Sequence, residues 1–273
     1  MVVQRYADVT TPSIETLVVD GLTVRACRPL GATRSPVLFV HGYFADATVF
    51  DEWLKLFAAR GFPAYAVNLR GRAGSRPGTD LGRTSMRDFA DDVSAVARSL
   101  GSPSIVGHSL GGLLAQMAAA RGDASAAVLI CPAPPRGIPL LTKRVILMQV
   151  KYLWPILRSR VVDPSLEDLR AIALNRVPVA EQGELLAQFV PDSGRAGRDI
   201  SVGVPVDSAR VLCPVLVIAS DDDRFIPRRI VERIAARYRA PIRTLAGHAH
   251  MLPREPGWQD AAELVAAWLL ERA

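Results

Sequence analysis

The stretch "PSIVGHSLGGLLAQMAAA", residues 103–120, changes its hydrophobic pattern within a few positions. Its first part is a short apolar run typical of a buried strand, and its last part is rich in alanine and leucine, which is typical of a helix. Between them, Gly107-His108-Ser109-Leu110-Gly111 matches the pattern Gly-x-Ser-x-Gly. We therefore expect a sharp strand–turn–helix unit with Ser109 at its apex.

A serine at such a turn is placed to act as a nucleophile. The turn brings strand and helix close together and strains the backbone of its central residue, so small residues are needed at Gly107, Gly111 and Gly112. The serine oxygen is then held at the carboxyl end of the sheet, where open α/β sheets bind ligands, and the helix N-terminus favours a developing negative charge. Because the short pattern also occurs by chance, this prediction depends on the strand–turn–helix context.

The rest of the chain alternates short β-branched apolar runs with longer amphipathic segments, which predicts a mostly parallel sheet covered by helices. We expect eight strands, over residues 14–20, 22–28, 36–42, 63–69, 103–108, 125–131, 214–220 and 241–247. The first two are joined at Asp20-Gly21, a two-residue hairpin signal, and should be antiparallel. Helices are expected near residues 47–60, 85–100, 110–121, 227–238 and 257–271.

The alternation breaks between residues 133 and 205, where three segments have helical patterns and none has a strand pattern. So long a connection predicts an inserted helical lid over 133–205, with the core domain formed by 1–132 and 206–273. Within the lid, residues 145–154 are apolar almost all round. The favoured interpretation is a helix packed between lid and body; the alternatives are an acyl-binding wall with Met148 and Trp154 pointing into a pocket, and a membrane-surface helix.

Composition excludes several classes of protein. Hydrophobic residues make up 49% of the 273 residues and charged residues 22%, as in ordinary globular proteins. The net charge of +6 is scattered and no basic run interleaves with aromatic residues, so we expect no nucleic-acid partner. We expect neither a secretory signal nor a membrane-spanning segment, and reduced thiols at Cys27, Cys131 and Cys213 favour a cytoplasmic location.

A serine nucleophile needs a base, and the chain has four histidines. His108 adjoins Ser109, so a tight turn should point its side chain elsewhere, and His41 is expected to brace the loop after its strand. His248 and His250, which follow the last predicted strand, remain as candidates for the base.

A carboxylate is needed to orient that histidine. The strand over residues 214–220 runs into Asp221, Asp222 and Asp223, more acids than a turn and a helix cap require. The resulting chain order, serine, then aspartate, then histidine, is that of one known triad arrangement.

Taken together, the motifs "HGYF", "NLRGRAGS", "GHSLGG", "SDDDRFIP" and "GHAHMLPREPGW" resemble the α/β-hydrolase fold superfamily, particularly the small bacterial serine hydrolases with a helical lid. The resemblance covers nearly the whole chain outside 133–205. It implies an α/β-hydrolase fold, with a mostly parallel eight-stranded sheet flanked by helices and an inserted lid.

The resemblance also implies roles for individual residues. Ser109 would be the nucleophile. The acid of such proteins stands four residues before a proline, which selects Asp223, with Asp222 as the fallback, although Ser220 replaces the usual glycine. The histidine usually stands five positions before a glutamate, which favours His250 over His248.

The "HG" of "HGYF" resembles the oxyanion loop, so the backbone amides of Tyr43 and Leu110 should meet the oxyanion, each contributing roughly 3 kcal/mol of transition-state stabilisation. Relatives often have a small residue or proline here, whereas Tyr43 and Phe44 are both bulky. This departure suggests an aromatic-walled acyl site and leaves open which of the two amides is used. Simple packing of the loop is the alternative interpretation.

These observations predict a serine hydrolase that cleaves small-molecule carboxylic esters through an acyl-enzyme on Ser109. Phe44, His108, Met148 and Trp154 are the candidate substrate-binding residues, and Leu147 would help them to set a preference for small or medium acyl chains. No cofactor or metal is expected, because no dinucleotide fingerprint or metal-ligand spacing occurs. A homo-oligomer is left open.

Two alternatives accompany this prediction. The same triad could cleave a carbon–carbon bond, a thioester or a lactone, or transfer the acyl group to an alcohol. A non-catalytic ligand-binding protein that has kept a hydrolase body would bind without turnover.

Overall fold

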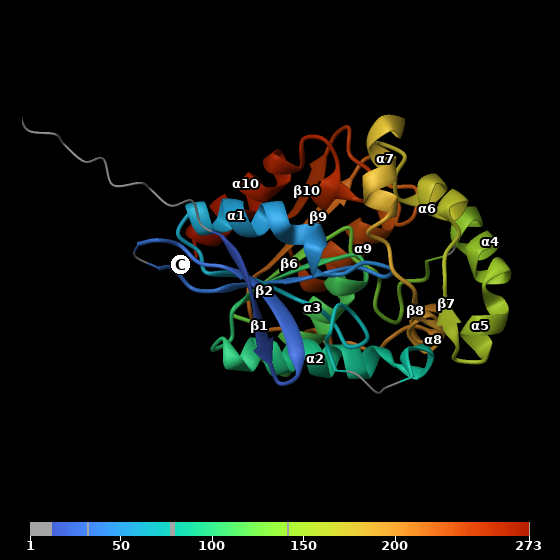
Figure 1. The fold of residues 1–273 in the computed structure, drawn as a ribbon, viewed down its shortest axis with the longest axis horizontal. Coiled ribbons are helices and arrows are strands. Elements are labelled where there is room, and N and C mark those ends of the chain that lie inside the picture. The colour runs from blue at the N-terminus through green and yellow to red at the C-terminus, as the bar shows by residue number, and fades with distance from the viewer. Residues whose placement is uncertain (1–12, 32, 77–79, 141, 273) are drawn as a thin grey trace, which may run out of the picture.

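An eight-stranded sheet, in the order β1-β2-β4-β3-β5-β6-β9-β10, organises the fold (Figure 1). The computed structural model describes residues 13–31, 33–76, 80–140 and 142–272. The strands are β1 (Ile14–Val19), β2 (Leu22–Cys27), β3 (Val37–Val40), β4 (Ala64–Val67), β5 (Ser104–His108), β6 (Ala126–Ile130), β9 (Val215–Ser220) and β10 (Ile242–Leu245). β2 pairs antiparallel with β1 and with β4, and the remaining neighbours pair in parallel. The predicted eight-stranded, mostly parallel sheet is confirmed.

The β1–β2 hairpin turns at Asp20 and Gly21, which have φ angles of 48° and 73°. Positive φ at both central residues is the geometry of a type I′ turn, whose twist matches that of the strands. The antiparallel pairing expected from this dipeptide is therefore present, with Val19 opposite Leu22.

Helices cover both faces of the sheet. One face is covered by α1 (Asp51–Ala59) and α10 (Trp258–Leu270), and the other by α2 (Met86–Ser99), α3 (Leu110–Arg121) and α9 (Arg228–Tyr238). Short 3-10 helices lie at η1 (Ala47–Phe50), η2 (Leu81–Arg83), η3 (Ser208–Arg210) and η4 (Leu252–Arg254). At the start of α2, Ser85 and Asp88 form the expected capping box, which satisfies backbone amides that the first turn leaves unpaired.

The hydrophobic core differs between the two faces. Beneath α1 it is aromatic: the Phe39 ring lies 5.0 Å from those of Phe50 and Phe57 and 6.0 Å from that of Trp53. Beneath α2 and α3 it is mainly aliphatic. Fully buried strands between two such layers explain why the parallel strands are continuous apolar runs in the sequence.

Between β6 and β9 the chain leaves the sheet and forms an inserted helical segment, seen in yellow-green to orange in Figure 1. Its helices are α4 (Lys143–Lys151), α5 (Leu153–Leu157), α6 (Leu166–Ile172), α7 (Val179–Leu186) and α8 (Gly194–Val202). The segment also contains a two-stranded antiparallel ribbon of β7 (Val161–Val162) and β8 (Asp192–Ser193).

Two features of this segment differ from the sequence expectation. The ribbon was not expected, because strands of two residues carry no detectable periodicity. α8 was missed because it contains Gly194 and Gly197, and glycine disfavours helices. Close packing requires both glycines: a Cβ at Gly194 would collide with the carbonyl of Arg160, and one at Gly197 would lie 2.9 Å from the Tyr43 hydroxyl.

The apolar run over residues 145–154 is not sandwiched between the insertion and the body, so the favoured interpretation was wrong. Leu147 and Val150 are 59% and 65% exposed, whereas Val145 on the opposite side of α4 is buried. The run continues into the following helix, α5, which contains Pro155. Within the described residues, no helix has the length and apolar character that spanning a membrane requires.

Candidate active site

Ser109 lies at the turn between β5 and α3, with φ 54° and ψ −117°. Such angles are strained for a residue with a side chain, and surrounding contacts must hold them in place. The flanking glycines allow those contacts: a Cβ at Gly107 would collide with the carbonyl of Gly111, and one at Gly111 with that of Val40. A Cβ at Gly112 would lie 2.7 Å from Pro132. The local sequence therefore folds into the sharp turn expected of it.

A chain of hydrogen bonds runs from Ser109 through His250 to Asp223. The Ser109 hydroxyl lies 3.0 Å from Nε2 of His250, and Nδ1 of the same ring lies 2.8 Å from Oδ2 of Asp223. All three side chains are buried. With Nδ1–H donating to the carboxylate, Nε2 is the nitrogen free to accept the serine proton.

The loop after β9 holds Asp223 in this position. Its second oxygen, Oδ1, accepts hydrogen bonds of 2.8 Å from the amides of Phe225 and Ile226. The Phe225 ring also packs edge-on against His250, with 5.1 Å between ring centroids. Asp223 and His250 are therefore held in place by further contacts besides the bond between them: two backbone amides hold the carboxylate, and the Phe225 ring packs against the imidazole.

The alternative residues named from sequence lie outside this chain of bonds. Asp222 pairs with Arg176 at 2.8 Å, and among the described residues it makes no hydrogen bond to His250. His248 lies 3.3 Å from Glu255, whose Oε2 also accepts the Ala249 amide at 2.7 Å. Burial raises the pKa of Glu255. Glu255 therefore braces the loop that presents His250.

The two remaining histidines are buried behind the site. His108 donates from Nε2 to the backbone carbonyl of His250 at 2.7 Å, and His41 donates from Nδ1 to that of Gly42 at 2.9 Å. Burial is the main cause that lowers the pKa of each to about 3, assisted by Arg72 near His41 and by His250 near His108. Both rings are neutral at neutral pH and act as fixed hydrogen-bond donors to the loops around Ser109.

Two backbone amides next to Ser109 are free to meet an oxyanion. The amides of Tyr43 and Leu110 donate no hydrogen bond to another described residue. The Phe44 amide, by contrast, donates to the carboxylate of Asp192 at 2.9 Å. The loop approaches the serine closely, since a Cβ at Gly42 would lie 3.1 Å from Cβ of Ser109. Of the two amides left open by the sequence, Tyr43 is the one without an acceptor.

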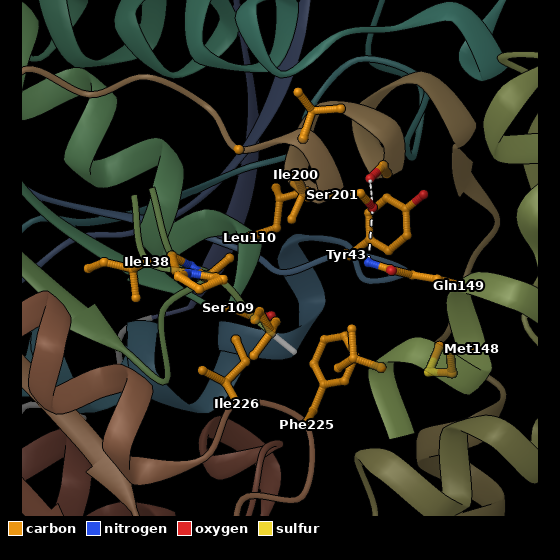
Figure 2. Close-up of a pocket in the computed structure, with 18 of the residues that line it drawn as sticks. Tyr43, Ser109, Leu110, Ile138, Met148, Gln149, Ile200, Ser201, Phe225 and Ile226 are labelled. Atoms are coloured by element: carbon orange, nitrogen blue, oxygen red, sulfur yellow. Dashed lines mark hydrogen bonds between the residues drawn. The ribbon is translucent and has the colours of Figure 1, made fainter. Parts of the chain in front are cut away.

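An apolar cavity of about 340 Å³ opens in front of Ser109 (Figure 2). Its walls come from the loop after β3, the chain after β6, helices α4, α5 and α8, and the loop after Asp223. In Figure 2, Ser109 lies near Leu110 and Ile226, and Phe225 projects between it and Met148. Gln149 of α4 donates a 3.1 Å hydrogen bond to Ser201 of α8 across one wall. The volume is at the lower end of the range for small-molecule sites.

The predicted substrate-binding residues divide into two pairs. Phe44 and Met148 line the cavity, whereas His108 and Trp154 do not. His108 is buried behind the site, where its ring donates a hydrogen bond to the backbone carbonyl of His250. Trp154 is 61% exposed because it lies on the outer side of α5, where its ring contacts the Arg158 guanidinium. Leu147 is likewise exposed on the outer side of α4.

Several lining residues were missed from sequence because they share no motif. They come from separate loops and helices and include Ile138, Tyr152, Ile156, Ile200, Phe225 and Ile226. Three of the lining residues are spaced four apart in the sequence: Met148, Tyr152 and Ile156. This spacing indicates a common helix face, but it does not show that the face borders the cavity.

Neither a metal site nor a disulfide accompanies the cavity in the part of the chain that the structure describes. No group of three or more histidine, cysteine, aspartate and glutamate side chains is arranged there to hold a metal ion. The three cysteines are free, and only Cys213 is partly exposed. Burial raises the pKa of the Cys131 thiol, which lies 3.3 Å from the Ser220 hydroxyl, so this cysteine stays protonated.

Comparison with known protein families places these features in context. The model of a family described as "Alpha/beta hydrolase family" matches residues 37–268. This span includes the loop over residues 42–45, the turn at Ser109, the inserted segment and the loops that carry Asp223 and His250.

Similar proteins include several ester-cleaving enzymes. A monoacylglycerol lipase from Mycolicibacterium smegmatis is 27% identical over 265 residues, which cover 87% of this chain and 88% of the lipase. A soluble variant of monoglyceride lipase from Saccharomyces cerevisiae has a TM-score of 0.74 at 15% identity, over 98% of this chain and 99% of that one. A thermophilic esterase from Thermogutta terrifontis has a TM-score of 0.71 at 17% identity, over 95% and 98% of the two chains. At these identities the two solved structures establish the likeness of fold alone.

Proposed function

This chain belongs to the alpha/beta hydrolase family, and we propose that it is a serine hydrolase that cleaves carboxylic esters through an acyl-enzyme on Ser109. The observation that carries the proposal is the buried chain of hydrogen bonds from Ser109 through His250 to Asp223, at the base of an apolar cavity. The likeness to a monoacylglycerol lipase supports the same reaction class.

In the first step, the Ser109 hydroxyl oxygen attacks the ester carbonyl carbon while its proton moves to Nε2 of His250. Asp223 accepts the Nδ1–H bond and stabilises the imidazolium that forms. The carbonyl oxygen becomes an oxyanion that the amides of Tyr43 and Leu110 stabilise. The intermediate then expels the alcohol, which takes the proton from His250, and leaves the acyl group on Ser109.

In the second step, His250 takes a proton from a water molecule, whose oxygen attacks the acyl carbonyl. The new intermediate releases the carboxylic acid, and the proton returns to Ser109. The two hydrogen bonds of His250, to Ser109 and to Asp223, hold the ring in the orientation that both proton transfers need.

We further propose that residues 133–205 act as a cap that sets the acyl preference. Met148, Tyr152 and Ile156 of the insertion face the cavity, and its volume of about 340 Å³ suits a small or medium acyl chain. Monoesters of glycerol with such chains are the first natural substrates to test, given the related lipase.

The test is intact-mass measurement after treatment with a fluorophosphonate, on the native protein and on Ser109→Ala, His250→Ala and His248→Ala. We expect one adduct on the native protein, none on Ser109→Ala, a rate at least about 10³-fold lower for His250→Ala, and a nearly native rate for His248→Ala. An ester series from acetate to palmitate then measures the acyl preference. A folded native protein that forms no adduct and hydrolyses no ester would overturn the proposal.

A further inference from the structure

A carboxylate from the inserted segment lies buried against the loop that carries Tyr43 and Phe44. Asp192, in β8, is completely buried, yet it belongs neither to the hydrogen-bond chain at Ser109 nor to the cavity wall. A buried ionised carboxylate is costly unless it is paired and hydrogen-bonded.

Asp192 is paired on both of its oxygens. Oδ2 accepts the Phe44 amide at 2.9 Å and a hydrogen bond from the guanidinium of Arg72, and Oδ1 accepts the Ser193 amide at 2.6 Å. The Arg72 side chain is only 1% exposed. It also donates to the carbonyl of Ala45 at 3.4 Å. The ion pair therefore joins the inserted segment to the loop over residues 42–45, through Asp192 at Phe44 and through Arg72 at Ala45.

Backbone contacts on both sides of Phe44 complete this junction. The Val190 amide donates to the Phe44 carbonyl at 2.9 Å, and the Tyr43 hydroxyl donates to the Ser193 carbonyl at 2.6 Å. Phe44 itself has a φ of 64°, a left-handed conformation that a bulky residue adopts only when its surroundings impose it. The inserted segment supplies those surroundings.

We propose that Asp192 is a positioning residue for the oxyanion hole, an inference that rests on the proposed ester hydrolysis at Ser109. By accepting the Phe44 amide, Asp192 removes that amide from competition and fixes the turn so that the neighbouring Tyr43 amide is the one presented to the substrate. The inserted segment thus orients a catalytic backbone group in addition to walling the cavity.

A second buried ion pair offers a matched control. Asp92 of α2 is also completely buried, and it accepts the Arg70 amide at 2.9 Å and the Arg70 guanidinium at 2.7 Å. Within the described part of the chain, Asp92 makes no hydrogen bond to residues 42–45. Loss of either pair should destabilise the fold, but only loss of the Asp192 acceptor should disturb the oxyanion loop.

The experiment compares Asp192→Asn with Asp192→Leu, each combined with Arg72→Met so that no unpaired charge is left buried. Asparagine keeps an acceptor for the Phe44 amide, whereas leucine of similar size does not. The control compares Asp92→Asn with Asp92→Leu, each combined with Arg70→Met. All kcat values are expressed per active site titrated with the fluorophosphonate, so that unfolded protein does not count.

We expect the leucine variant at position 192 to have a kcat about tenfold to hundredfold below that of the asparagine variant, with KM changed by less than about threefold. The two variants at position 92 should differ by less than about threefold in kcat, while both lower the melting temperature. Equal kcat for the asparagine and leucine variants at position 192 would overturn the proposal. Absence of turnover in the native protein would instead overturn the proposed function.

A measurement on the protein without substitutions avoids any loss of folding. In amide NMR spectra, phosphonylation of Ser109 should move the Tyr43 amide proton downfield, because a phosphonyl oxygen occupies the position of the oxyanion. The Phe44 amide should stay in place, bound to Asp192. A shift at Phe44 without one at Tyr43 would show that Asp192 does not select the donor.

Discussion

The body of the molecule and its inserted segment differ in how deeply they bury tryptophan side chains of their helices. Trp53 of α1 is completely buried among aromatic rings, whereas Trp154 of α5 is 61% exposed. Both lie in helices with apolar residues around them. The difference teaches that an apolar helix face is buried only where a neighbour covers it: α1 packs on the sheet through Trp53, whereas the outer faces of α4 and α5, with Leu147, Val150 and Trp154, are exposed.

The insertion is nevertheless firmly joined to the body at a few buried atoms. Asp192 and Ser193 are completely buried, and Ser193 donates to the carbonyls of Gly82 and Thr84 at 3.1 Å and 2.5 Å. We therefore expect substitutions on the exposed outer faces of α4 and α5 to change stability little, and substitutions at buried Asp192 and Ser193 to change it strongly.

The largest effect should come from a glycine of the body. In Gly111→Ala the new Cβ would collide with the backbone carbonyls of Val40 and His41, which cannot move without breaking the sheet, so we expect a loss of about 5 kcal/mol or more in unfolding free energy. Gly183→Ala in α7 is the control: it meets no atom within 4 Å and should stabilise the protein by about 0.5–1 kcal/mol. Urea unfolding measures both. A well-folded Gly111→Ala would mean that the turn is looser than its contacts indicate.

The two tryptophans give the next largest difference. Trp53→Ala should lower the unfolding free energy by about 3–5 kcal/mol, because it opens a cavity among aromatic rings and leaves the carbonyl of Pro253 without its donor. Trp154→Ala should change it by less than about 0.5 kcal/mol, since the side chain is largely in water. Calorimetry of both variants tests the contrast. A large loss for Trp154→Ala would show that a further contact covers the outer face of α5.

A smaller effect should appear as acid sensitivity of the body, which contains all four histidines. The pKa of His41 and of His108 is about 3 in the folded protein, against an unfolded value near 6.5. Below pH 6.5 the unfolded chain binds protons that the folded protein does not, so the stability is complete above pH 6.5 and is lost as the pH falls toward 3. Each histidine contributes a slope of up to about 1.4 kcal/mol per pH unit.

Urea unfolding between pH 7 and pH 4.5 measures this slope. His108→Gln keeps a donor for the His250 carbonyl but has no titrating ring. It should therefore lower the slope of unfolding free energy against pH by the contribution of one histidine, up to about 1.4 kcal/mol per pH unit. An unchanged slope in this variant would assign the acid sensitivity to other groups.

The smallest effect should come from the ion pair at the edge of the insertion. Arg176 and Asp222 are 47% and 31% exposed, so their pair is screened by water. We expect Asp222→Asn to cost less than about 1 kcal/mol and to change kcat by less than threefold. Asp223→Asn, one residue along, should lower kcat by about 10⁴-fold, because the imidazole loses the partner that orients it. Similar losses for both variants would mean that the two acids share the role.

The sequence predicted most of the body because its signals are local. Apolar strands of four to six residues, the dipeptide Asp20-Gly21 and the capping box at Ser85 each specify their own backbone geometry. The choice of Asp223 and His250 came from the resemblance of their loops to a known family. In the structure these are the residues that lie within hydrogen-bond distance of one another and of Ser109.

The insertion was predicted less completely. Its existence followed from the missing strand pattern, but the ribbon of β7 and β8 and the helix α8 were not expected. The outward orientation of Trp154 was also missed, because an apolar helix shows which faces exist without showing which face has a neighbour.

The sequence by itself thus determined the turn at Ser109, the alternation of strands and helices, and the order of serine, aspartate and histidine along the chain. These depend on backbone sterics and hydrophobic periodicity, which act over a few residues. Only the tertiary structure decided that the Tyr43 amide has no acceptor among the described residues, that Asp192 binds the amide of Phe44, and which side chains enclose the cavity. Such contacts join residues 148 positions apart, and no local pattern of charge or hydrophobicity encodes them.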